Sequence, residues 1–307
     1  MKATRDAYGD ALVELGGKYK DVVALDADLA GSTRSIKFKK VLPDRFFDMG
    51  VAEASMVDIS AGLALCDKRP YVSSFAVFIT GRAFESVRQS IAYQKLPVVL
   101  CGSHGGVNVG EDGGSHQGIL DIALMRTLPN MKVVIPADYN ETYNAVLTTI
   151  DNNGPVYIRT SRMKSPIFTE GDFYFGKGKI LKTGKDVTLV SCGFLVWYAL
   201  EAAKILEKEG IDVSVIDMAT VKPLDEDLVY DFAKSTKRMV TIEEHTIFGG
   251  LGSTVAEFLS ENYPIKLKRI GMYDVFGESG SCDDLLCNFG FNAIGISYTV
   301  REWLKKL

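Results

Sequence analysis

Residues 46–56 read Phe46-Phe47-Asp48-Met49-Gly50-Val51-Ala52-Glu53-Ala54-Ser55-Met56, and this stretch decides the fold class. It predicts a short strand over 46–49, a bend at Gly50, and a helix that begins at Glu53 and runs to residue 66. A second β-rich run, 71–75, follows the helix. Strand, helix and strand in this order predict a parallel unit whose helix covers one face of the sheet.

The same alternation runs through the rest of the chain. Further strands are expected over 22–25, 97–101, 132–135 and 156–160, with helices over 4–15, 82–93 and 140–150. The cycle restarts at 186–191, 194–208 and 213–217 and continues over 225–234, 238–242, 253–261 and 265–270. We therefore expect an α/β fold with two doubly wound domains.

A glycine-rich stretch separates the two expected domains. Residues 171–184 contain Gly171, Gly176, Gly178 and Gly184 without a sustained pattern, which is typical of a linker. The expected division is a first domain over 1–170 and a smaller second domain over 185–307.

The composition excludes several classes of protein. The chain has 307 residues, and 35 Lys+Arg against 39 Asp+Glu give a formal charge of −4. Binding to nucleic acid or a membrane surface needs clustered Lys and Arg, and the densest cluster is only Lys37-Phe38-Lys39-Lys40. The start of the chain lacks a secretion signal and no stretch is apolar over a bilayer's width, so we expect a cytoplasmic protein. Five cysteines without a Cys-x-x-Cys pair predict free thiols and no zinc site built within this chain.

Ligands of doubly wound sheets bind beyond the carboxyl ends of the strands, so residues that follow the strands are candidate site residues. Glu53 could simply complement the dipole of its helix. Its neighbours Ala52, Ala54 and Ser55 are small enough for close packing, which would desolvate Glu53 and raise its pKa toward that of an acid–base catalyst.

An aromatic pair, Phe75 and Phe78, follows the next strand. Packing in the core is the simpler interpretation. If the chain bends after Phe75, the two rings could instead line a flat apolar slot for a heteroaromatic ring.

The segment 101–118 is the densest polar motif of the chain. It contains two of the three histidines, seven glycines and the adjacent Glu111 and Asp112. Almost no side chain in it is apolar, so ligand binding is favoured over a mobile linker. A zinc site from His104, Asp112 and His116 is the alternative, which their long spacing and the lack of a thiolate disfavour.

Basic residues follow the last strand of the first domain. Arg159 and Arg162 could be a surface fork or a phosphate clamp, because guanidinium matches phosphate bidentately. Arg5 and Ser32 could join them. The glycine-rich turn 243–253 lacks the dinucleotide-binding spacing and is interpreted as structural or interface-forming.

Six segments, in order, resemble the C-terminal half of transketolases. The most specific are Gly110-Glu111-Asp112-Gly113-Gly114-Ser115-His116-Gln117 and Ile158-Arg159-Thr160-Ser161-Arg162, and the others are 2–9, 26–29, 49–53 and 74–78. The resemblance implies a pyrimidine-binding domain over 1–170 and a transketolase C-terminal domain over 185–307. The length resembles the shorter subunit of the split form of the family.

The resemblance also implies a partner chain. Thiamine-dependent enzymes bind the diphosphate through a metal held by a Gly-Asp-Gly segment. This chain contains no such segment; at Gly171-Asp172 the next residue is Phe173 and not glycine. The cofactors implied are thiamine diphosphate and Mg²⁺, with the metal and diphosphate ligands supplied by an N-terminal-section subunit in an α2β2 assembly.

The resemblance assigns roles residue by residue. Glu53 would bind the pyrimidine N1′ through a protonated carboxyl, Phe78 would stack on the pyrimidine with Phe75 beside it, and Asp28 would lie near the cofactor or a subunit interface. His116 and Asp112 would contact sugar hydroxyls, with His116 close to the reacting carbons. Arg5, Ser32, His104 and Arg162 would bind the substrate phosphate. Gly81 replaces an aromatic of some members, so Phe84 could complete the apolar wall, and Ser115 replaces the more common Thr.

The implied activity is transfer of a two-carbon ketol unit from a ketose phosphate to an aldose phosphate. The alternatives are a 1-deoxyxylulose-5-phosphate synthase-like or another thiamine-diphosphate enzyme subunit, and a scaffold module that binds no cofactor.

Overall fold

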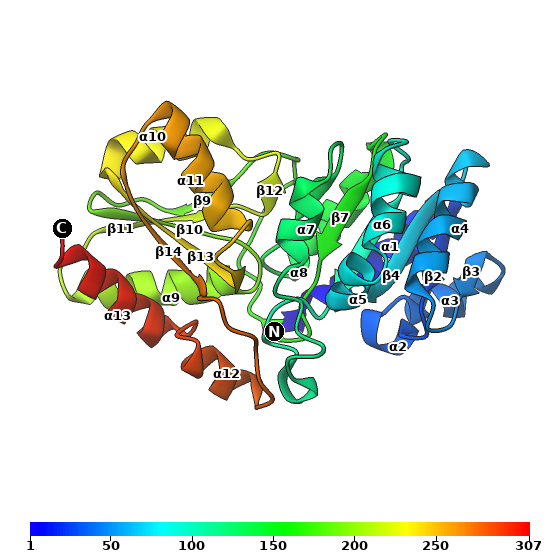
Figure 1. Cartoon of the computed structure of the whole chain (residues 1–307), viewed down its shortest axis with the longest axis horizontal. Helices are drawn as coiled ribbons and strands as arrows, with labels where there is room; N and C mark the ends of the chain where they lie inside the picture. Colours follow the sequence, from blue (N-terminus) through cyan, green and yellow to red (C-terminus); the bar gives the residue numbers. More distant parts are fainter.

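The computed structural model describes residues 1–307 and contains two large sheets side by side (Figure 1). The first has the strand order β12-β6-β7-β5-β4-β2-β3. Six of its strands are parallel: β2 (Val22–Asp26), β3 (Phe46–Asp48), β4 (Arg69–Phe75), β5 (Val99–Ser103), β6 (Lys132–Val134) and β7 (Val156–Arg159). The α/β architecture expected from the sequence is therefore present.

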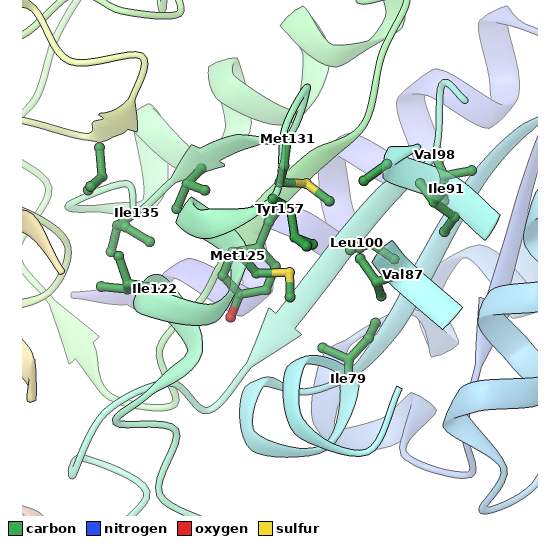
Figure 2. Close-up of a cluster of buried hydrophobic side chains, with 14 of the residues drawn as sticks. Ile79, Val87, Ile91, Val98, Leu100, Ile122, Met125, Met131, Ile135 and Tyr157 are labelled. Carbon is green, nitrogen blue, oxygen red and sulfur yellow. The ribbon is translucent and has the colours of Figure 1, made fainter. Parts of the chain in front are cut away.

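Helices cover both faces of this sheet because its strands are apolar on both sides. Val22 and Ala24 of β2 pack in one cluster with α1 (Thr4–Lys18) and α8 (Tyr139–Thr148). Val23 and Leu25 pack in another with α4 (Glu53–Leu65), α5 (Ala76–Gly81) and α7 (Asp121–Thr127). Figure 2 shows part of the second cluster, where Ile79 and Val87 approach Leu100 of β5. Two short helices, α2 (Ala30–Thr33) and α3 (Ile36–Val41), follow β2.

The second sheet has the order β14-β13-β10-β11-β9. Its strands are β9 (Lys179–Lys182), β10 (Val187–Ser191), β11 (Val213–Asp217), β13 (Arg238–Thr246) and β14 (Lys266–Met272). Its helices are α9 (Leu195–Lys208), α10 (Glu226–Thr236), α11 (Leu251–Asn262), α12 (Cys282–Asn288) and α13 (Ala293–Leu304). All of these strands except the antiparallel edge strand β9 are parallel.

Several elements differ from the sequence pattern. The strand β9 lies within 171–184, which was expected to be a linker. It is short and lies at the edge of its sheet, so it leaves no clear apolar pattern in the sequence. The strand β12 (Thr220–Lys222) follows the second-sheet strand β11 but pairs antiparallel with β6 of the first sheet, which joins the two sheets. A two-stranded ribbon of β1 (Lys2–Ala3) and β8 (Lys164–Ser165) brings the chain start to the end of β7.

The expected helix 82–93 is also divided in the structure. The helix α5 begins directly after Phe75, and α6 (Phe84–Ser86) continues into the π-helix η2 (Val87–Ala92). The early turn into α5 places Phe78 one helical turn beyond Phe75 instead of on the strand. Three short 3₁₀ turns, η1 (Pro43–Arg45), η3 (Gly110–Asp112) and η4 (Thr149–Asp151), complete the chain. No helix is long and apolar enough to cross a membrane.

Candidate active site

Four aromatic rings gather beyond the carboxyl ends of β4 and β5. The rings of Phe75 and Phe78 stack with centroids 5.9 Å apart and an interplanar angle of 17°. His104, directly after β5, lies 4.1 Å from Phe75, and His116 stands edge-on to Phe78 at 5.3 Å. The bend after Phe75 thus gives an aromatic surface at the carboxyl end of the sheet, with Phe75 buried and Phe78 half-buried.

Glu53 lies beside this surface at the N-terminus of α4. Its side chain is 5% exposed, and its ion-pair partner is Arg82, whose Nη1 lies 3.7 Å from Oε1. The Arg82 guanidinium also lies over the Phe78 ring, 4.3 Å from its centroid. Arg82 therefore bridges the carboxylate and the aromatic surface, a role that its sequence position after Gly81 did not suggest.

Arg5 and His104 form a fixed pair at the other end of the site. Arg5 Nη1 donates to the carbonyl of Ser32 at 3.0 Å and contacts His104 Nε2 at 3.2 Å. Because Arg5 can only donate, Nε2 accepts, and the ring proton of His104 lies on Nδ1, 2.8 Å from Ser103 Oγ. The buried Nε of Arg5 has no hydrogen-bond partner within the chain.

This end of the site is positively charged. Burial, followed by the charges of Arg5, Arg162 and Arg34, lowers the pKa of His104 to about 3, which keeps the imidazole neutral. Arg162 Nη1 donates to the carbonyl of Val109 at 2.5 Å and lies 3.7 Å from Asp112. Arg34 was not singled out from the sequence, because only the α2–α3 turn brings it beside Arg5.

The carboxyl end of β2 carries one exposed and one buried carboxylate. Asp28 is exposed at the end of β2, where its backbone N–H donates to Asp48 Oδ1 at 3.1 Å. The buried carboxylate here is Asp26, which accepts from Leu29, Thr33 and Ser35 and so shapes the turn that presents Ser32. Burial raises the pKa of Asp26 to about 6, against these hydrogen bonds.

Three further side chains lie next to α5 or next to His116. Phe84 is half-buried against the core cluster that includes Ile79 and Val87. The exposed Phe276, from the segment after β14, lines a pocket of about 140 Å³ together with Gly81 and Val77. Ser115 Oγ lies 2.9 Å from His116 Nδ1 and so orients that ring.

Two family models match this chain. "Transketolase, pyrimidine binding domain" matches residues 1–167, and "Transketolase, C-terminal domain" matches residues 176–296. The chain belongs to the transketolase family. It is accordingly a member of a family of transferases, and the fold class expected from the sequence is confirmed.

Transketolase-family relatives match this chain over nearly its full length. It is 46% identical to a transketolase C-terminal section of Methanocaldococcus jannaschii, over 99% of this chain and 97% of that protein. It is 38% identical to one of the subunits of an apulose-4-phosphate transketolase of Phocaeicola vulgatus, over 100% and 99% of the two chains. Among solved structures it resembles a split-gene transketolase described as an inactive beta4 tetramer, with a TM-score of 0.92, 48% identity and 99% coverage of both chains.

Proposed function

We propose that this chain is one subunit of a thiamine-diphosphate-dependent transketolase that transfers a two-carbon ketol unit from a ketose phosphate to an aldose phosphate. The observation that carries the proposal is the buried carboxylate of Glu53 beside the face of Phe78. A flat apolar surface next to a buried carboxyl fits an aminopyrimidine, which has a stacking face and a basic ring nitrogen. The match to the pyrimidine-binding domain of the family supports the same assignment.

Glu53 and the aromatic pair would hold the pyrimidine. With the cofactor bound, the Glu53 carboxyl would form a hydrogen bond with the ring nitrogen N1′, and Phe78 would stack on the ring with Phe75 behind it. Thiamine diphosphate supplies, when bound, the nucleophilic carbon that accepts the ketol unit. Since Arg82 pairs with Glu53 in this chain, it must swing away before the carboxyl can act in this way.

The basic end would hold the substrate phosphate. Arg5 and Arg162 offer guanidinium donors to the phosphate. The Nε2 atom of the neutral His104 carries no proton to donate, and it accepts from Arg5 and so orients that side chain. Ser32 is the neighbouring hydroxyl. His116 and Asp112, on the loop in between, would contact sugar hydroxyls; His116 lies against Phe78 and Asp112 lies near Arg162. Asp28 is assigned to the rim of the site, near the cofactor or a subunit interface.

The metal and diphosphate would be bound by another subunit. No group of three or more His, Cys, Asp or Glu side chains in this chain is arranged to hold a metal ion. We assign Mg²⁺ and the diphosphate to an N-terminal-section partner, in an α2β2 assembly. Within this chain we assign the pyrimidine site to residues 1–170, the connection to 171–184 and the C-terminal domain to 185–307.

The experiment is reconstitution with a candidate diphosphate-binding subunit, thiamine diphosphate and Mg²⁺. The expected products are a ketose phosphate two carbons longer than the aldose acceptor and an aldose phosphate two carbons shorter than the ketose donor. Consumption of pyruvate with release of carbon dioxide, in place of ketol transfer, would favour a 1-deoxyxylulose-5-phosphate synthase-like activity. No turnover with any partner and donor would favour the scaffold alternative.

A further inference from the structure

The loop over residues 104–118, here called the channel loop, packs against Arg159 of β7 and against the C-terminal part of the chain. A Cβ added at Gly105 would lie 1.9 Å from Arg159 Nε, and one added at Gly106 would lie 2.3 Å from Glu244 Cδ. Gly106 also has φ +89°. These glycines are therefore required by close packing, not by mobility of the loop.

Glu244, on β13 of the second sheet, holds the middle of the channel loop. Its Oε1 accepts the Asn108 backbone N–H at 2.6 Å, and its Oε2 accepts from Asn108 Nδ2 at 2.7 Å. Ser161 Oγ donates to Asn108 Oδ1 at 3.0 Å, so the orientation of the amide is fixed from both sides. All three side chains are buried.

Arg159 holds the end of the same loop. Its Nη2 donates to the Gly118 carbonyl at 3.0 Å and to the Glu244 carbonyl at 2.8 Å. Further along, Gln117 Nε2 donates to the Glu278 carbonyl at 2.9 Å, and Cys282 Sγ lies 3.1 Å from the Asn108 carbonyl. Figure 1 shows α12 beside this loop. Arg159 and the C-terminal part together thus fix the loop along most of its length.

We propose that Glu244 is a positioning residue: by binding both N–H groups of Asn108 it sets the geometry of the loop that bears His104, Asp112 and His116. The C-terminal domain thereby acts on the active site without touching substrate. The effect on catalysis rests on the proposed function, whereas the effect on the loop does not.

The charge state of Glu244 controls this contact. Hydrogen bonds to a carboxylate are stronger than those to a neutral acceptor, and both oxygens are used here. Burial raises the pKa of Glu244 to about 7, against the opposing charge of Arg159 and the hydrogen bonds from the loop. The other titratable groups that face it are Tyr198 of α9 and Cys282 of α12. Below pH 7 the carboxyl takes up a proton, one acceptor oxygen is lost, and the loop loosens.

The chain offers a matched control on the same strand. Glu243 is equally buried, but its carboxylate accepts from the backbone N–H groups of Leu251 and Gly252 at the start of α11. Glu243→Gln therefore makes the same chemical change within the C-terminal domain without touching the channel loop.

Hydrogen–deuterium exchange of the full-length chain tests the positioning without any assay of activity. At pH 8 Glu244→Gln should speed exchange of the channel-loop amides about tenfold, because a buried donor loses its partner. Glu243→Gln should speed exchange at the start of α11 only. The double variant Glu244→Gln with Asn108→Asp restores donor–acceptor pairing and should return the loop to wild-type exchange. Unchanged loop exchange in Glu244→Gln, an equal effect of Glu243→Gln, or a failed rescue would each overturn the proposal.

Kinetics of the reconstituted enzyme test the consequence for catalysis. Wild-type kcat/KM should fall as the pH drops through about 7. Glu244→Gln should be about tenfold lower at pH 8 and lack this pH step, because it resembles the protonated state at every pH. Altered loop exchange with unaltered kinetics would overturn the catalytic role. An inactive wild-type complex with the same exchange results would instead count against the proposed function alone.

Discussion

The Arg82 guanidinium lies 3.7 Å from the Glu53 carboxylate and covers the face of Phe78. The Arg82 guanidinium therefore contacts both groups of the proposed pyrimidine site, the carboxylate of Glu53 and the ring of Phe78. A pyrimidine ring can reach them only after Arg82 swings outward, and its 58% exposed side chain leaves room for that movement.

Arg82→Ala should strengthen thiamine diphosphate binding by the reconstituted enzyme about two- to fivefold. The reason is that an exposed cation–π contact, worth about 0.5–1 kcal/mol, no longer competes for the ring. Titration of intrinsic fluorescence with the cofactor measures this. Arg88→Ala, which breaks an exposed ion pair with Glu85, is the control. Weaker binding by Arg82→Ala would contradict the competition and identify Arg82 as a ligand contact.

Glu53→Gln should lower kcat for ketol transfer about 10²- to 10⁴-fold, the range expected when a positioned acid–base group is lost. Association with the partner subunit should not change. Asp58→Asn is the control, because Asp58 lies on the same helix, is exposed and bonds only Ser86 and Ser90. Full activity in Glu53→Gln would be incompatible with the proposed mechanism.

Arg162→Ala should raise KM for phosphorylated sugars far more than it lowers kcat, because a phosphate contact binds substrate and transition state alike. The same change should leave KM for an unphosphorylated ketose nearly unaltered. Steady-state kinetics with both substrates separates the two cases. An equal loss with both sugars would show that Arg162 acts mainly by holding the channel loop through Val109.

His104 should remain neutral throughout the working range of the enzyme. Its pKa is lowered to about 3 by burial and by the neighbouring arginines, from an ordinary value of 6.5. As the pH falls, His104 is protonated in the unfolded chain before it is protonated in the folded chain. Its contribution to the free energy of unfolding is therefore present above pH 6.5 and is lost as the pH falls toward 3. In NMR spectra the His104 ring signals should not titrate between about pH 5 and 8. A midpoint near pH 6.5 would contradict this.

The strands could be predicted because burial on both faces imposes an apolar run that local sequence shows, as in Val22–Asp26. Glu53, Phe75 and Phe78 could be singled out because strand ends and their flanking residues are visible in the local sequence. The assigned roles of the site residues remain predictions. Asp28 illustrates the limit of this approach, since the sequence indicates that it lies near the end of a strand but not that it stays exposed.

The missed features depend on contacts between distant segments. Arg82 matters through its position over Phe78, and Arg34 through a turn beside Arg5. The strand β12 has too few residues for a pattern and gains its place by pairing with β6. Glu244 and Asn108 are 136 residues apart, so their hydrogen bonds leave no local signal except the glycines of the channel loop.

The most direct test of the central claim is a titration of this chain with the diphosphate-binding subunit, measuring ketol transfer at saturating thiamine diphosphate and Mg²⁺. The proposed function predicts no activity from this chain alone and a rise that levels off at equimolar subunits. Ketol transfer by the isolated chain would contradict it.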